Sequence, residues 1–401
     1  MTIQHVFSTS AAKAYLDCPR KRWLQYHAPN GTATGGLERT VMSVALSTGI
    51  YVHNGLASLL QENALEDVID NVLADYYEEC HARRLEVEAG SEWTYTMDEQ
   101  AALIEAQLRG AAIVLLPRLL ADYDVIDIER EETVQMASTI TFMSRADAVL
   151  RRKTDKALFV LNWKTVGGAG DWWAKRFEYD VQTLSECVGI EQRLGERVAG
   201  VLIVGLDKGK RMPPSDREKE MGVTQYRQAS PLIYGYKTDA NPPATRAMYQ
   251  VDYTRAKGWK RFPVWDDPDG MTVKRWIDDV VPRETLEAQF VQLPPIMRQD
   301  AHVDAWRRQT LAREARIERD VRVMKEHIDN DYPETPFVLD ALFEQNSDAC
   351  VRFGPCPMLS ICWDAQVATD PIGSGLFRAR RPHHSYEVAL TTLTEEVKEN
   401  G

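Results

Sequence analysis

The sequence has no apolar run approaching the roughly 20 residues that a membrane-spanning helix needs. Its first residues lack the basic start and apolar stretch of a secretion signal, and internal repeats and low-complexity tracts are also missing. A glycine-rich turn at Gly167, Gly168 and Gly170 is not followed by the Lys-Ser/Thr pair of a phosphate loop, which excludes that mode of nucleotide binding. These absences predict a cytoplasmic globular protein with no membrane partner.

Positive charge is in deficit, because 48 Lys and Arg residues face 60 Asp and Glu residues and leave a net charge of −12. This balance argues against a surface covered with non-specific nucleic-acid contacts. A groove can still be basic on an acidic protein, although solvated surface charge is the simpler interpretation of any one basic cluster. The basic clusters lie at Arg20–Arg22, Arg151–Lys153, Lys208–Arg211 and Arg307–Arg308.

Cysteine is also scarce, with six residues that a cytoplasmic setting favours as thiols or metal ligands rather than disulfides. Cys80 and Cys187 lie in helical-looking segments and are predicted to be core thiols. The other four are split between the two ends of the chain. Because tetrahedral thiolate ligation needs four sulfurs, these four cysteines predict a shared metal ion or iron–sulfur cluster if the two ends of the chain meet. If the ends do not meet, the cysteines are more simply buried thiols. These four are Cys18 in YLDCPRKRW and Cys350, Cys356 and Cys362 in CVRFGPCPMLSICW.

The order of apolar patterns predicts an α/β fold. Helical spacing covers 8–27, 38–62, 64–86, 98–121, 177–194, 271–290 and 300–329. Three consecutive strands are expected within 124–136, 139–152 and 157–165, and a buried strand over 198–206. We divide the chain into a helical N-terminal part (1–121), a core of sheet and helix (122–240), a helical part with the cysteine triplet (241–363) and a tail (364–401).

Two of the predicted strands carry polar residues that suit phosphodiester hydrolysis. Asp147 lies in SRADAVL, and the apolar run ALFVL leads into Asn162, Trp163 and Lys164. Strand alternation puts positions 162 and 164 on one face. Asp147, with an oxygen from position 162, can hold Mg²⁺ or Mn²⁺, and the lysine can orient water or stabilise phosphate charge. Alone, each is equally well explained as a turn acid or a strand-end lysine.

Two further polar residues flank this region. The segment GIYVH places His53 one turn after Gly49 on a predicted helix, and an imidazole suits Mn²⁺ better than Mg²⁺. Taken alone, His53 is more simply a helix histidine with a local hydrogen bond. The segment YDVQT sets Gln182 early in the helix after the polar strand, where a lone glutamine is usually a surface residue.

In this order, YLDCPRKRW, GIYVH, RADAVL, LNWKT, YDVQ and the cysteine triplet resemble the PD-(D/E)XK superfamily. More narrowly, the chain is similar to RecB-type nucleases with an iron–sulfur cluster, such as the AddB nuclease domain, CRISPR-adaptation exonucleases and related phage proteins. The resemblance covers about residues 8–363. It implies a restriction-endonuclease-like mixed sheet flanked by helices, with a mostly helical N-terminal part and a C-terminal metal-cluster region.

The resemblance also implies roles for individual residues. His53, Asp147, Asn162 and the carbonyl of Trp163 would bind Mg²⁺ or Mn²⁺, Lys164 would be the catalytic lysine, and Gln182 would contact DNA or the active site. Cys18, Cys350, Cys356 and Cys362 would hold a [4Fe–4S] cluster, with zinc open because the first gap of the triplet is wider than in AddB. The implied partners are DNA ends or single strands and a helicase-like or other protein subunit.

Two departures from the family pattern bear on activity. Asn162 stands where the family has an acid, and an amide brings no negative charge, so weakened or absent cleavage is expected. Glu186 stands where the family often has an aromatic residue, four places after Gln182. Since Lys164 and Thr165 are intact, we favour a change introduced at position 162 over natural decay. Two functions remain: a metal-dependent, exonuclease-type DNA nuclease, or a non-catalytic DNA-binding or scaffolding subunit.

Overall fold

The computed structural model describes residues 5–32, 35–168, 177, 180–220, 222–237, 260–266, 270–352, 355–382, 384 and 387. Its largest sheet is mixed, with strand order β15-β10-β9-β8-β5 and β16 beside β10. β9 and β10 run parallel, and the other neighbours are antiparallel. The predicted helix-flanked mixed sheet is confirmed. The strands are β5 (Tyr123–Ile128), β8 (Ala148–Arg152), β9 (Leu158–Val166), β10 (Val198–Asp207), β15 (Phe290–Gln292) and β16 (Ile296–Met297).

A second sheet joins the start of the chain to the core. Its order is β1-β7-β6, formed by β1 (His5–Ser8), β7 (Ile140–Arg145) and β6 (Glu131–Ala137). β1 runs parallel to β7, and β6 runs antiparallel to it. The helix that follows β1 is therefore delivered to the edge of the core, although its residues belong to the predicted N-terminal part.

The prediction of three strands between residues 124 and 165 is wrong, because the described structure has five there. The first two predicted strands are each two strands joined by a turn. Glu129, between β5 and β6, adopts a left-handed backbone with φ 49°, and Asp147 lies in the bend just before β8 rather than within a strand. Neither turn carries glycine or proline, and Asp147 is the one common turn residue between the paired strands, so the sequence signals these turns weakly.

The predicted helix over 8–27 is two helices, α1 (Thr9–Asp17) and α2 (Pro19–Tyr26). Pro19 has no N–H to donate, and it disfavours a helical backbone at the residue before it. Cys18 accordingly has an extended backbone, with φ −162° and ψ 119°. The side chain of Ser8 caps α1 by accepting from the backbone N–H of Ala11 at 3.3 Å. Cys18 thus sits at a rigid junction between two helices.

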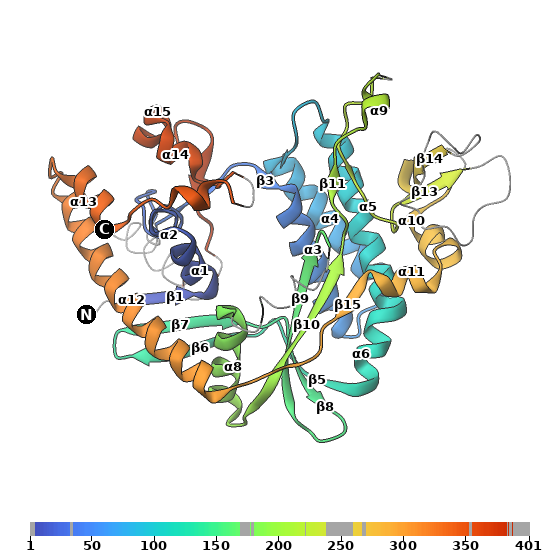
Figure 1. The fold of residues 1–401 in the computed structure, drawn as a ribbon, viewed down its shortest axis with the longest axis horizontal. Helices are drawn as coiled ribbons and strands as arrows, with labels where there is room; N and C mark the ends of the chain where they lie inside the picture. Colours follow the sequence, from blue (N-terminus) through green and yellow to red (C-terminus); the bar gives the residue numbers. More distant parts are fainter. Residues whose placement is uncertain are drawn as a thin grey trace, which may run out of the picture.

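Helices cover both faces of the β9–β10 pair (Figure 1). On one face lie α3 (Val44–Leu60), α4 (Leu65–Arg83) and α5 (Trp93–Gly110), which continues through a π turn into α6 (Leu116–Asp122). The other face is covered by α8 (Val181–Leu194). Phe159, Leu161 and Trp163 pack into the core on the α3–α5 side, whereas Leu158 and Val160 pack on the α8 side. This alternation directs positions 162 and 164 toward α8.

The C-terminal part wraps back to the start of the chain. The long helix α12 (Asp300–Asp329) has the predicted bounds and packs against α8, β6 and β7. The predicted helix over 271–290 is interrupted at Pro282 and divides into α10 (Val273–Arg275), a π turn and α11 (Arg283–Ala288). Then follow α13 (Thr335–Leu342), α14 (Leu359–Trp363) and α15 (Ala365–Thr369). β17 (Phe377–Ala379), in the predicted tail, pairs with β2 (Leu37–Arg39).

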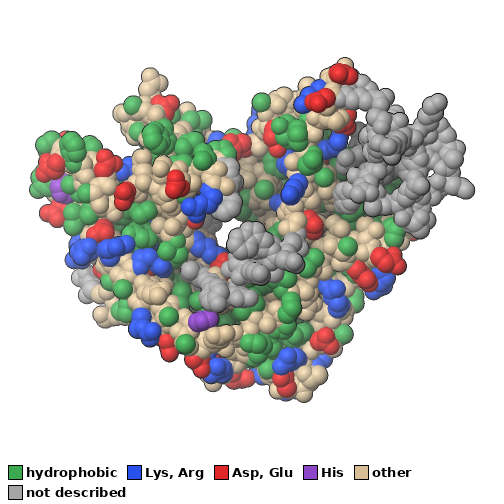
Figure 2. Space-filling model, viewed as in Figure 1, with side chains coloured by type: hydrophobic (Ala, Val, Ile, Leu, Met, Phe, Trp, Pro, Cys, Tyr) green, Lys and Arg blue, Asp and Glu red, His purple; other side chains and the backbone are tan. Residues whose placement is uncertain are grey.

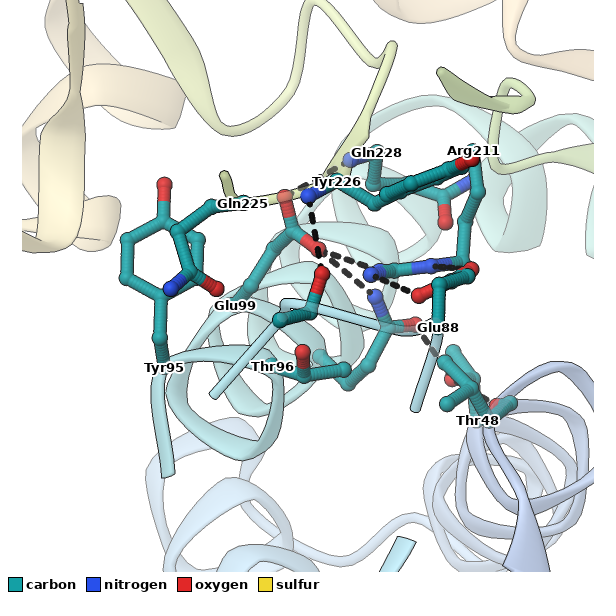
Figure 3. Close-up of polar contacts among 12 residues, drawn as sticks. Thr48, Glu88, Tyr95, Thr96, Glu99, Arg211, Gln225, Tyr226 and Gln228 are labelled. Carbon is teal, nitrogen blue, oxygen red and sulfur yellow. Dashed lines mark hydrogen bonds and ion pairs between the residues drawn. The ribbon is translucent and has the colours of Figure 1, made fainter. Parts of the chain in front are cut away.

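The segment after β10 is anchored by the buried carboxylate of Glu99 on α5. This carboxylate accepts hydrogen bonds from the Arg211 guanidinium and the Gln228 backbone N–H, each at 2.6 Å (Figure 3). It also accepts a hydrogen bond from the Tyr234 hydroxyl at 2.6 Å. Arg211 also pairs with Glu88 at 2.7 Å. Within this segment, β11 (Arg211–Met212) and β12 (Arg227–Gln228) form a short antiparallel pair.

The remaining short elements are β3 (Met42–Ser43), β4 (Leu85–Glu86), α9 (Asp216–Glu220), β13 (Tyr234–Lys237) and β14 (Lys260–Pro263). Cys80 and Cys187 are buried, as predicted for core thiols. Gly170, in the glycine-rich turn noted in the sequence, lies outside the described residues. Within the described ranges, no helix has both the length and the hydropathy to cross a membrane.

Candidate active site

Asp147 is placed against the middle of β9 by its position just before β8. Its Oδ2 accepts a hydrogen bond from the backbone N–H of Trp163 at 2.6 Å. The Trp163 side chain is fully buried on the opposite face, which fixes the strand at this point. Burial alone would raise the pKa of Asp147, but His53, Lys164 and the Trp163 N–H together hold it below its ordinary value. Asp147 is therefore a stable carboxylate at neutral pH.

His53 reaches the same carboxylate from helix α3, with Nδ1 3.4 Å from Asp147 Oδ1. The helix can approach this closely because Gly49 faces β9. A Cβ at position 49 would lie 2.7 Å from Thr165 Oγ1. The two ends of the predicted GIYVH motif thus have separate tasks: the glycine permits the approach, and the histidine joins the site.

Asn162, Lys164 and Gln182 form one hydrogen-bonded group on the α8 side of β9. Lys164 Nζ lies 3.5 Å from Asn162 Oδ1 and 3.3 Å from Gln182 Oε1, while Gln182 Nε2 donates to Asn162 Oδ1 at 3.1 Å. Residues 162 and 164 share a face, as alternation predicts. Gln182 lies in the first turn of α8, whose N-cap is the side chain of Asp180. The structure therefore gathers His53, Asp147, Asn162, Lys164 and Gln182 in one place.

Glu186 is the main site residue that sequence reasoning did not assign. It follows Gln182 by one turn of α8, and its Oε2 accepts a hydrogen bond from Asn162 Nδ2 at 2.7 Å. Its side chain is only 1% exposed. Burial raises its pKa to about 7, although Lys164 and the hydrogen bonds from Asn162 and Gln182 favour the charged form. The signal in the sequence was an acid four residues after Gln182, on the same helix face.

Glu129 is a second acid that was missed. It lies in the β5–β6 turn, pairs with Arg145 at 3.1 Å and donates its backbone N–H to the Asp147 carbonyl at 3.1 Å. Burial and the neighbouring charge of Asp147 raise its pKa to about 7. No motif marks this residue, because its approach to Asp147 depends on a turn that the sequence does not signal.

The donor set suits a divalent cation. Imidazole, carboxylate and amide-oxygen ligands are those that Mn²⁺ or Mg²⁺ accept. Burial, with the negative charge of Asp147 nearby, raises the pKa values of Glu129 and Glu186 to about 7. The neighbouring Lys and Arg side chains do not fully cancel this rise. As the described side chains stand, no three His, Cys, Asp or Glu residues are arranged to hold a single ion.

The four cysteines predicted to meet are brought together around a single cavity of about 140 Å³. Cys18 reaches it from the α1–α2 junction, Cys350 and Cys356 from the segment leading into α14, and Cys362 from α14 itself. Burial raises the pKa of Cys362 to about 11, although the nearby Arg20 favours its thiolate. The cavity lies between a segment near the start of the chain and a segment near its end, and Lys21 and Arg352 also line it.

A mixed sheet flanked by helices thus brings an acid, a strand lysine and a helix glutamine together at β9. Residues 6–362 match the PD-(D/E)XK nuclease superfamily, and the chain belongs to that superfamily. Membership makes it a hydrolase-family protein whose substrate class is nucleic acid, typically cleaved with a divalent metal. No curated protein matches the sequence.

Proposed function

We propose that this chain is a metal-dependent DNA nuclease of the RecB type, in which Glu186 supplies the acid absent at position 162. The supporting observation is the 2.7 Å hydrogen bond that joins Glu186 to Asn162. A carboxylate on α8 can reach the place that a carboxylate on β9 would occupy. Asn162 then serves to hold Glu186, and its presence does not require an inactive protein.

The ligands of the proposed ion are His53, Asp147, Glu186 and the Trp163 carbonyl, with the amide oxygen of Asn162 as a weak fifth. A bound Mg²⁺ or Mn²⁺ would polarise the scissile phosphate and lower the pKa of a water ligand. His53 orients the Asp147 carboxylate, whose Oδ1 is 3.4 Å from the imidazole. Burial of Asn162 and Glu186 excludes bulk water from this side of the site.

Lys164 would orient the attacking water and offset charge that develops on the phosphate. Gln182 holds the ammonium in place, because its Oε1 accepts from Lys164 while its Nε2 donates to Asn162. Exonuclease-type action on DNA ends or single strands, in recombination, phage replication or defence, is part of the proposal. A helicase-like subunit is the protein partner proposed with it.

The test is degradation of linear duplex and single-stranded DNA by the purified chain with Mg²⁺, with Mn²⁺ and with EDTA. The proposal expects cleavage with metal, none with EDTA, and a loss of about 10³-fold in Lys164→Met. A chain that binds DNA but leaves it intact with every metal is the non-catalytic scaffold that Asn162 alone would suggest.

For the cysteine cavity we propose a [4Fe–4S] cluster, with zinc as the alternative metal. The proposal is supported by the four cysteines that line one cavity, the number of thiolates that either group needs. As the described side chains stand, the cysteines do not already form a metal-holding group, so binding would have to draw the sulfurs together. Iron and sulfide analysis of protein purified without oxygen tests this, and zinc without iron would refute it.

A further inference from the structure

Lys13, on helix α1, lies beside the candidate active site although it is far from it in the sequence. Its Nζ is 2.8 Å from Asp180 Oδ1 and 3.4 Å from Gln182 Oε1. The same Gln182 oxygen is 3.3 Å from Lys164 Nζ. Two lysine ammonium groups from different parts of the chain thus converge on one neutral amide oxygen.

Helix α1 is held in this position by contacts on both sides of Lys13. At its start, Thr9 Oγ1 lies 3.2 Å from Ser185 Oγ on α8. At its end, Cys18 enters the cysteine cavity. Because α1 has only nine residues, these two contacts fix where the Lys13 side chain can reach.

Lys13 pairs with Asp180, but its side chain is still 39% exposed, so an anion can reach its ammonium group. The contacts of both lysines with Gln182 are long, at 3.3 and 3.4 Å, and their acceptor is uncharged. A phosphate oxygen would make a shorter, charge-assisted hydrogen bond to either ammonium.

We propose that Lys13 binds an internal backbone phosphate of the DNA strand, next to the phosphate held at Lys164. This inference rests on the proposed nuclease function. Figure 1 places α1 to the left of the β9 end, and Figure 2 shows a notch in the surface between the part of the molecule that carries α1 and the part that carries α3 to α5. The cysteine cavity then has a functional consequence, since it fixes the helix that carries Lys13.

The test measures DNA binding by the full chain in EDTA, with fluorescence anisotropy as the readout, at a series of salt concentrations. For Lys13→Met we expect a roughly tenfold weaker Kd and a salt-dependence slope that falls by about 0.7 on single strands, the loss of one phosphate contact. Lys13→Arg should restore most of the affinity. Lys156→Met is the matched control, because Lys156 is exposed in the turn before β9, away from Lys164.

Asp180→Asn separates phosphate binding from a structural role of Lys13. Asparagine caps a helix as well as aspartate does, so α8 keeps its N-cap while the negative charge disappears. If Lys13 binds phosphate, this variant binds DNA at least as tightly as the wild type. If Lys13 merely holds Asp180, the variant weakens binding as Lys13→Met does, and the proposal fails.

Two further outcomes would overturn the assignment. One is an unchanged salt slope in Lys13→Met, and the other is an effect confined to oligonucleotides with a terminal phosphate, which would mean an end-binding site. Because binding is measured without metal, a failure of the chain to cleave DNA refutes the proposed function and leaves the Lys13 result interpretable.

Discussion

Asn162 on β9 and Glu186 on α8 share a buried hydrogen bond of 2.7 Å, between two residues that are each 1% exposed. Neither residue alone makes a conventional site: the strand residue has no charge, and the helix residue is too far along the chain to belong to the strand motif. Joined, they present one carboxylate to the side of β9 that carries Lys164.

Asn162→Asp should tighten metal binding and destabilise the metal-free protein. The variant puts two carboxylates where one now lies, and like charges in a buried site raise each other's pKa unless a cation separates them. We expect about tenfold tighter Mn²⁺ binding by calorimetry and a lower Tm in EDTA at pH 8. Unchanged Mn²⁺ affinity would mean that position 162 does not face the metal.

Glu186→Gln should alter the pH dependence of stability in the metal-free protein. The pKa of Glu186 is raised from 4.5 to about 7, so the folded state retains a proton that the unfolded state loses within this range. Wild-type stability should therefore fall between about pH 4.5 and 7, by up to about 3 kcal/mol relative to the variant, whose amide does not titrate. Above pH 7 the difference stays constant. Urea unfolding in EDTA at pH 5 and pH 8 measures the difference in unfolding free energy between the wild type and the variant. The same difference at both pH values would refute the raised pKa of Glu186.

Gly49→Ala should displace helix α3 from β9 and carry His53 away from Asp147. The new Cβ would lie 2.7 Å from Thr165 Oγ1, closer than such contacts normally are. We expect a destabilisation of about 1–3 kcal/mol and weaker Mn²⁺ binding. Adding Thr165→Ala to Gly49→Ala removes the clashing hydroxyl, so the double variant should recover most of the lost stability and most of the Mn²⁺ binding. A double variant as impaired as Gly49→Ala would show that the clash lies elsewhere.

Cys18→Ala should prevent binding of the proposed iron–sulfur cluster and loosen the α1–α2 junction. The cysteine cavity joins residues more than 300 positions apart, so losing one ligand frees the N-terminal helices from the C-terminal segment. We expect iron content to fall and Tm to drop by several degrees. Cys80→Ala is the control, since this buried thiol lies outside the cavity and its loss should leave the iron content intact.

Sequence reasoning found the residues whose positions follow from local periodicity. Lys164 and Asn162 share a face because strands alternate, and Gln182 starts a helix because Asp180 caps it. The bounds of α12 were likewise predicted, since its apolar spacing is regular over 30 residues.

The residues that were missed depend on tertiary packing. Glu129 approaches Asp147 only because a residue with no turn signal adopts φ 49°. Lys13 reaches Gln182 only because β1 pairs with β7 and delivers α1 to α8. Glu186 was visible as an unusual acid, but its partner across the β9–α8 interface is set by how deeply the helix packs. Such contacts between distant segments have no short-range pattern.

The most direct measurement is the Mn²⁺-dependent rate of linear DNA cleavage by the wild type, Glu186→Gln and Glu196→Gln. Glu196 is an exposed acid just after α8, paired with Arg151, and serves as the matched control. The wild type and Glu196→Gln should cleave at similar rates, with Glu186→Gln slower by about 10²-fold or more although it binds DNA as tightly. Equal rates in all three proteins would contradict the assignment of Glu186 as the displaced acid of this site.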